Sequence, residues 1–182
     1  MTDRAATKVR AVGEDVVLHP GTFAPYVEHL ATLLGTTLRD GADARKAELA
    51  SALDGQPSRQ LRKLYTIGDL RGTGTYFTGS ALANRLITGS AENLPEARRV
   101  VDPACGAGDL LVACARHLPL KATVAETLKD WGERLTGFDI NPSFVDATRY
   151  RLALLALERT RSSPLEIRKP LRLEKIFPNI QC

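Results

Sequence analysis

The segment Val100–Leu111, VVDPACGAGDLL, constrains the fold more than any other part of this 182-residue chain. Two valines lead to an acid, Asp102, which is followed by a turn containing Gly106 and Gly108 and then by an apolar run. Glycine is needed where backbone must approach a ligand without an intervening Cβ. N–H groups at the start of a helix can receive a carboxylate or another polar ligand group. The segment predicts a strand, a ligand-binding turn and a helix. The alternative interpretation is an ordinary strand-to-helix turn that binds no ligand.

The glycine spacing argues against a dinucleotide site. Binding of a pyrophosphate in a Rossmann fold uses the string G-x-G-x-x-G. Here the third position of that string is Leu111. The turn therefore predicts a different ligand.

A second acid, Asp139, ends the segment LTGFDI, for which we predict a strand over Leu135–Ile140. An acid at the tip of the second strand accepts two hydrogen bonds from a ribose diol in nucleoside-binding α/β folds. The spacing from Asp102 is 139 − 102 = 37 residues, longer than the roughly 20 of a minimal unit, and an extra helix around Trp131 accounts for the surplus. Taken alone, Asp139 is more typical of a helix cap or a surface acid than of a ribose ligand.

An aromatic string lies upstream, at Gly74–Leu86 (GTYFTGSALANRL), with Tyr76, Phe77 and Thr78 in sequence. Three strings in this order resemble motifs X, I and II of class I methyltransferases, and DPACGAG resembles the motif I form of adenine-N6 DNA methyltransferases. Gly79 stands where motif X usually has proline. Over about residues 70–160, the order resembles the N-terminal half of the methylase subunits of type I restriction systems.

The resemblance implies S-adenosyl-L-methionine as cofactor and the N6 atom of adenine in DNA as methyl acceptor. Asp139 would hold the ribose and Ile140 would pack on the adenine ring. The implied cofactor-binding residues come from all three motifs: Tyr76, Phe77, Thr78, Asp102, Pro103, Ala104, Cys105, Gly106, Gly108, Asp139 and Ile140.

The catalytic [NDS]-P-P-[YFW] string of the family is absent from this sequence. The most similar string is Asn141–Phe144 (NPSF), which comes just after Asp139 and is better explained as a helix N-cap. No catalytic residue is assigned. Three hypotheses stay open: a truncated methyltransferase, one subunit of a split enzyme whose partner carries the catalytic motif, and a non-catalytic binding or assembly module.

The predicted fold class is α/β, with a partial Rossmann-like class I methyltransferase sheet of parallel strands and crossover helices. We expect a helical region over residues 1–70 and the cofactor-binding part over 71–182. The predicted strands are Arg99–Val101, Leu135–Ile140 and Leu165–Arg168. Predicted helices span Gly21–Leu38, Ala42–Leu53, Ser58–Tyr65, Thr78–Thr88 with Thr78 as cap, a segment from Gly106, Ala122–Leu135, and Asn141 or Ser143 to Thr160, while Gly68–Gly74 is expected to be a link.

Composition narrows the class of protein. No apolar run has the length of about 18 residues that a membrane span needs, and the opening MTDRAATKVR lacks the apolar core of a signal peptide. Three scattered cysteines exclude a disulfide framework and favour a cytoplasmic location. Cys105 has no histidine placed to activate it as a nucleophile.

The net charge of +4 comes entirely from residues 141–182, with eight basic and four acidic side chains there. We interpret this excess as a solvated helix face, with nucleic-acid contact as the alternative. The last segment, Lys175–Cys182 (KIFPNIQC), has apolar residues with no obvious cover of their own. An open sheet edge together with this segment predicts a surface for a second polypeptide.

Overall fold

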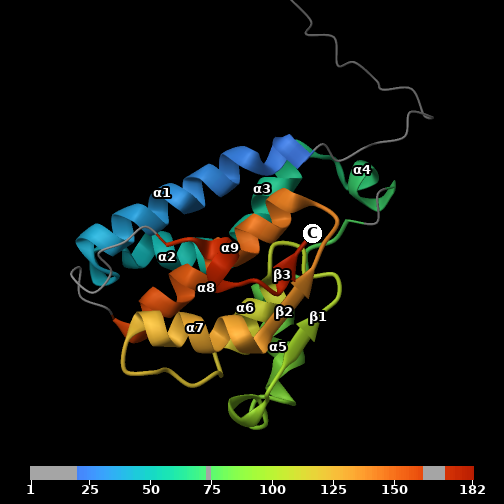
Figure 1. Cartoon of the computed structure of the whole chain (residues 1–182). Helices are drawn as coiled ribbons and strands as arrows, with labels where there is room; N and C mark the ends of the chain where they lie inside the picture. The colour runs from blue at the N-terminus through green and yellow to red at the C-terminus, as the bar shows by residue number, and fades with distance from the viewer. Residues whose placement is uncertain (1–19, 73–74, 162–170) are drawn as a thin grey trace, which may run out of the picture.

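A parallel three-stranded sheet lies at one side of a mainly helical body (Figure 1). The computed structural model describes residues 20–72, 75–161 and 171–182. Its strands are β1 (Val100–Asp102), β2 (Leu135–Phe138) and β3 (Ile180–Gln181), in the order β1-β2-β3. Asp102 pairs with Gly137, and Gly137 pairs with Ile180 on the other side. The structure confirms a mixed helix and sheet fold with parallel strands.

Helices precede the sheet and separate its strands. They are η1 (Pro20–Phe23), α1 (Ala24–Asp40), η2 (Asp43–Arg45), α2 (Lys46–Leu53), α3 (Gln56–Leu64), α4 (Ile67–Gly72), α5 (Ser80–Thr88), η3 (Leu94–Glu96), α6 (Asp109–Ala115), α7 (Val124–Arg134), α8 (Pro142–Thr160) and α9 (Leu173–Ile176). Among the described residues, no helix has the length and apolarity that crossing a membrane requires.

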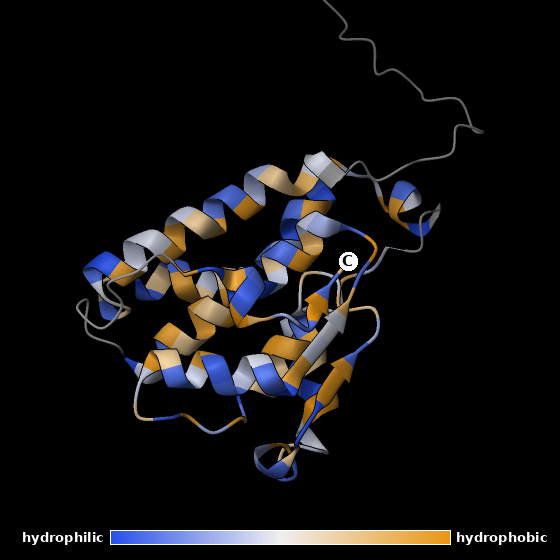
Figure 2. Ribbon diagram, in the orientation of Figure 1, coloured by the Kyte–Doolittle hydropathy of each residue, from blue (hydrophilic) through white to orange (hydrophobic). Residues whose placement is uncertain are grey.

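Helix α8 is the centre of the core. It packs against α1, α2, α6 and α7, and its stretch Leu152–Leu157 is buried throughout. The ribbon coloured by hydropathy shows the same core and shows β1 as apolar at the open edge of the sheet (Figure 2). Val101 on that strand is 57% exposed. The helices expected in the N-terminal region therefore share one core with the sheet, because α8 packs against α1 and α2 as well as against β3.

Two expectations for local structure are wrong. The stretch Gly68–Gly74 was expected to be a link, but α4 occupies it as far as Gly72, with Asp69 accepting from the N–H and hydroxyl of Thr66 at its start. Thr78 is not the cap of the next helix. The N-cap of α5 is Gly79, whose φ of 73° is unfavourable for a residue with a side chain.

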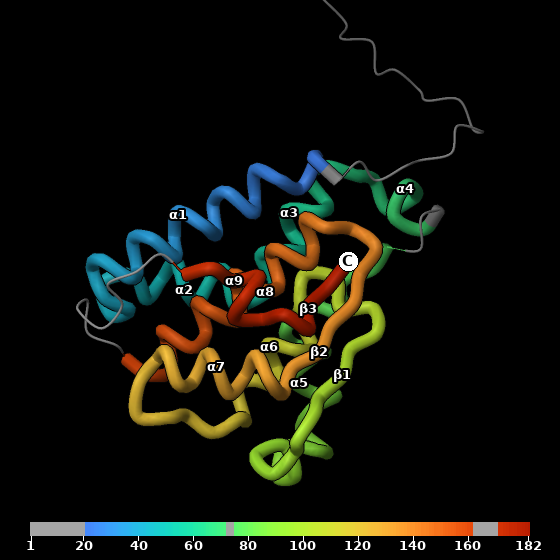
Figure 3. Tube along the Cα trace, viewed as in Figure 1, coloured from blue at the N-terminus to red at the C-terminus, as the bar shows by residue number. Residues whose placement is uncertain are grey.

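The third strand was expected at Leu165–Arg168, which lies outside the described residues. Among the described residues, β2 pairs with β1 on one side and with β3, at the end of the chain, on the other (Figure 3). The expectation that Lys175–Cys182 lacks cover is wrong as well, because Phe177 and Ile180 are fully buried. Tertiary packing against α7 and α8 covers these side chains, and the sequence pattern alone does not show such packing.

The basic excess of residues 141–182 is only partly a solvated face. Arg151 has an exposure of 0% and donates from Nε to the Ala52 carbonyl at 2.9 Å. Arg159 donates to the Ala115 and Leu118 carbonyls, at 2.7 and 2.8 Å. These two arginines of α8 form hydrogen bonds to backbone carbonyls of other segments, so part of the basic excess stabilises the fold.

Candidate cofactor site

The turn after β1 is shaped by its two glycines. Gly106 and Gly108 have φ values of 52° and 83°, a region that favours glycine. The Gly108 N–H donates to the Cys105 carbonyl at 2.8 Å and closes the turn. The Cys105 N–H donates to the Phe138 carbonyl at 2.8 Å, which ties the turn to the end of β2. The sequence motif therefore forms the expected tight turn at the carboxyl edge of the sheet.

The two predicted acids lie at this edge. Asp102 ends β1, is 9% exposed, and accepts from the Ala104 N–H at 3.1 Å. Asp139 follows β2 and accepts from the Gly106 N–H at 3.0 Å and the Asn141 N–H at 2.8 Å. Within the described part of the chain, neither carboxylate has an ion-pair partner. The edge is thus a region of uncompensated negative charge.

Burial raises the pKa of Asp102, and the nearby charge of Asp139 raises it further, while the hydrogen bond from Ala104 acts in the opposite direction. A raised pKa means that the folded protein holds the charged form at a cost. A protein that needed only a turn here would gain stability from an uncharged residue.

The segment Tyr76–Gly79 forms the wall opposite the turn. The Phe77 ring lies over Gly106, so closely that a Cβ there would be 3.0 Å from the ring. Phe77 also packs edge-on against Phe144 of α8, with ring centroids 4.9 Å apart. Tyr76, in contrast, is 68% exposed. The upstream aromatic string thus contacts the glycine turn from a distant part of the sequence.

A small cavity lies between this wall and the turn. It measures about 20 Å³, on the order of one water molecule. A nucleoside-sized ligand therefore needs the wall to open or must lie partly outside. The cavity is lined by Tyr76, Phe77, Thr78, Asp102, Ala104, Cys105, Ala107, Asp109 and Leu110.

The remaining predicted residues do not line this cavity. Pro103 is exposed in the turn, and Gly106 and Gly108 are buried in it. Asp139 is bonded to the turn through the Gly106 N–H, as described. Ile140 is 95% exposed and does not line the cavity.

Asp109 was missed in the sequence. Its side chain is 4% exposed, and its Oδ2 atom accepts from the Gly79 N–H at 2.8 Å. This bond joins the wall to the first residue of α6. The available signal was a single acid at the head of the otherwise apolar run DLLVACA.

The thiol of Cys105 is unsuited to nucleophilic catalysis. It is buried, and burial together with the charges of Asp102 and Asp139 raises its pKa to about 12. The thiol therefore stays protonated at neutral pH. This agrees with the sequence, which places no histidine beside it.

Asn141 acts as a helix cap. Its Oδ1 atom accepts from the Ser143 N–H at 3.0 Å, at the start of α8. The string NPSF thus has the structural role expected of an N-cap.

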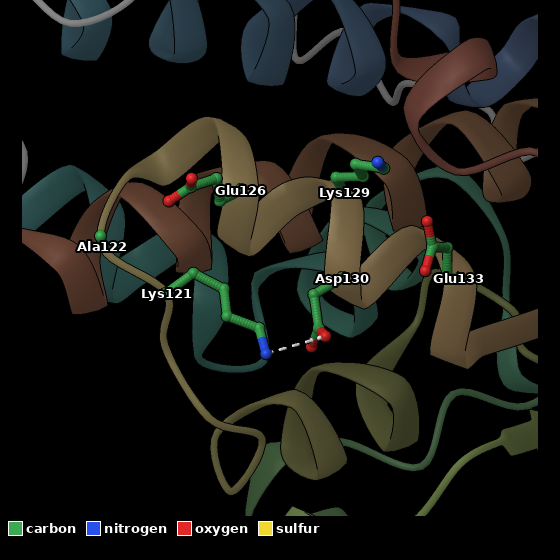
Figure 4. A pocket seen from close by; sticks show the side chains of 6 residues that line it. All are labelled: Lys121, Ala122, Glu126, Lys129, Asp130 and Glu133. Carbon is green, nitrogen blue, oxygen red and sulfur yellow. Dashed lines mark ion pairs between the residues drawn. The ribbon is translucent and has the colours of Figure 1, made fainter.

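A second, more open depression runs along α7 (Figure 4). Two of the charged residues that line it form an ion pair: Lys121 lies 3.1 Å from Asp130, which also pairs with Arg134 of α7 at 3.0 Å. Glu126 completes a capping box with Thr123. No group of metal-ligating side chains is found among the described residues. The depression is a solvated helix face, and the strand edge remains the candidate site.

Comparison of this chain with protein-family models, with curated proteins and with solved structures finds no significant match.

We predict that Asp102→Asn raises the free energy of unfolding at neutral pH. The amide still accepts from Ala104 but carries no charge, so the cost of burying the carboxylate disappears. Because the folded pKa of Asp102 is raised, the wild-type cost is present at neutral pH and is relieved as pH falls through that pKa. The advantage of the variant should shrink over the same range. Urea denaturation at several pH values tests this, and an advantage that grows toward acid pH would contradict the prediction.

Proposed function

We propose that this chain binds S-adenosyl-L-methionine in a partial Rossmann-like class I methyltransferase fold, as the cofactor-binding part of a DNA adenine-N6 methyltransferase. One observation carries the proposal: Asp102 and Asp139, without ion-pair partners among the described residues, flank a glycine turn at the carboxyl ends of two adjacent parallel strands. Ligands of open α/β sheets bind in this position.

The charge of the site supports this ligand over a dinucleotide. S-adenosyl-L-methionine carries a sulfonium, an ammonium and a carboxylate group and is a net cation, whereas a dinucleotide brings two negative phosphates. Like charges close together repel, and opposite charges within a partly buried site attract. Two uncompensated carboxylates therefore favour the cationic ligand, in agreement with Leu111 at the position where a pyrophosphate site needs glycine.

The residues present fit such a ligand. Each Asp139 oxygen already accepts one internal hydrogen bond and retains a lone pair for a ribose hydroxyl. Asp102, which lines the cavity, would accept from the ammonium group. The Phe77 ring covers Gly106 in the turn. When bound, the cofactor would supply an electrophilic methyl group, and these residues would bind and orient it.

In this proposal the target adenine is held by a second polypeptide or a further domain. A base inside a duplex must leave the stack before its amino group can react. The family's base-holding string does not occur in this sequence. The exposed edge strand β1, with Val101, offers a place for a further strand to pair. The alternative is a non-catalytic binding or assembly subunit with the same cofactor site.

Calorimetry with S-adenosylhomocysteine, S-adenosylmethionine and NAD tests the proposal, and we expect binding of the adenosyl amino acids alone. Asp139→Ala should weaken that binding by about 1–3 kcal/mol, because two hydrogen bonds to the ribose are lost. Asn141→Ala is the matched control two residues away: it should cost about 1 kcal/mol of stability as a lost cap and leave affinity unchanged.

Binding of NAD without binding of the adenosyl amino acids would overturn the proposal. A reconstituted enzyme that loses methyl transfer in Asn141→Ala while retaining cofactor affinity would place catalysis in NPSF instead. Cofactor binding with no methyl transfer in any combination of partners would favour the non-catalytic alternative.

A further inference from the structure

A buried ion pair lies behind the candidate site. Arg151 Nη2 and Asp109 Oδ1 are 2.9 Å apart, and their side chains are 0% and 4% exposed. Burial of two charges is costly unless their other polar atoms are also satisfied. Arg151 donates in addition to the carbonyls of Ala52 in α2 and Ala107 in the glycine turn. Asp109 accepts in addition from the Gly79 N–H.

This pair connects four separate parts of the chain. Arg151 comes from α8, and Ala52 belongs to the N-terminal helices. Asp109 begins the helix after the turn, and Gly79 ends the wall segment that starts at Tyr76. Each connection is a hydrogen bond or an ion pair between residues that lie at least 30 positions apart in the sequence. The two residues of the pair itself are 151 − 109 = 42 positions apart.

One face of α8 supports the whole turn. Phe144 contacts the ring of Phe77, Thr148 donates to the Gly106 carbonyl at 2.9 Å, and Arg151 donates to the Ala107 carbonyl. The spacing of four and then three residues places these side chains along one helix face. Arg151 is the charged member of that face and the one that also reaches Asp109.

We propose that Asp109 and Arg151 are positioning residues that hold the Tyr76–Gly79 wall and the glycine turn in the arrangement that binds the cofactor. The proposal rests on the function proposed above. Asp109 fixes the wall at Gly79, directly after Tyr76–Thr78, which line the cavity. A wall held in place before binding loses less conformational entropy when the ligand arrives, which increases affinity.

Asp109→Asn is the sharp test because it preserves shape. The carboxylate accepts from the Gly79 N–H with Oδ2 and forms an ion pair with Arg151 through Oδ1. An amide carries no charge and has one acceptor oxygen beside a donor NH₂ group, so it cannot keep both the bond from Gly79 and the ion pair. Arg151→Lys is the second variant: it retains the charge but lacks the fork that reaches two carbonyls and the carboxylate together.

Two measurements read out the wall. Hydrogen exchange on the full chain without ligand should show the amides of residues 75–83 exchanging about tenfold faster in both variants, as expected for a locally opened segment. Calorimetry with S-adenosylhomocysteine should show about tenfold weaker binding, because the wall must then be ordered on binding. Leu128→Ala is the matched control, since this buried core leucine lies in α7, outside the wall, the glycine turn and α8. It should lower the melting temperature but change neither local exchange nor affinity.

Faster exchange spread evenly over the chain, as in Leu128→Ala, would show a purely structural pair and overturn the proposal. Local opening with unchanged affinity in a protein that binds S-adenosylhomocysteine would overturn it too. If the wild-type chain does not bind that ligand, the proposed function fails, and the exchange measurement alone decides whether Asp109 and Arg151 hold the wall.

Discussion

Gly132→Ala is expected to displace the C-terminal segment from the fold and to cost on the order of 3 kcal/mol or more, at or above the upper end for an overpacked core. Gly132 lies in α7, and a Cβ there would overlap the carbonyl oxygen of Ile176. A backbone oxygen cannot rotate aside as a side chain does. Its displacement would uncover Phe177 and Ile180, which are fully buried, and would separate β3 from β2.

Urea denaturation measures this loss, and Gly35→Ala provides the matched control. Gly35 also lies inside a helix, α1, but has open space around it. The same substitution should there stabilise the protein by about 0.5–1 kcal/mol, because alanine favours the helix. Equal effects at the two positions would show that the α7 contact with Ile176 carries no weight.

The C-terminal segment also shows where sequence reasoning stops. The motif VVDPACGAGDLL was sufficient to predict β1, the turn and α6, because strand, glycine turn and helix follow one another within twelve residues. β3 has only two residues, and neither its position nor its pairing follows from a local pattern. Its place depends on contact with Gly132 and Gly137, more than 40 residues away.

The same limit applies within the candidate site. Tyr76, Phe77, Thr78 and Asp102 were predicted from local strings, and the structure brings them to one cavity. Arg151 was counted only as part of a basic excess. A charge in the middle of an apolar helix stretch gives a weak sign of burial, but its partner Asp109 cannot be identified without the tertiary fold. Local motifs thus predict the residues that line the cavity better than the residues that hold them in place.

Gly108→Ala is expected to have the largest effect within the site. Its φ of 83° costs a residue with a side chain about 1–2 kcal/mol. In addition, the new Cβ would lie 2.8 Å from Thr148 Cγ2 and 2.9 Å from Thr148 Oγ1. The hydroxyl of Thr148 donates to the Gly106 carbonyl, so a shift of this side chain also loosens the turn. We expect a total loss of about 2–4 kcal/mol in stability, the range of backbone strain combined with overpacking.

Gly55→Ala separates the two causes. Gly55 has a similar left-handed conformation, with φ of 71°, but its nearest neighbour is the flexible end of Arg59 at 3.6 Å. It should show the conformational cost alone. A double-mutant cycle with Thr148→Ala then isolates the contact, because removal of Cγ2 and Oγ1 relieves the closest approaches while the Thr148 Cβ remains 3.1 Å away. Gly108→Ala should destabilise the Thr148→Ala background less than the wild type. Strictly additive free energies of unfolding would mean that α8 does not support the turn through Thr148, and the loss at Gly108 would then come from backbone strain alone.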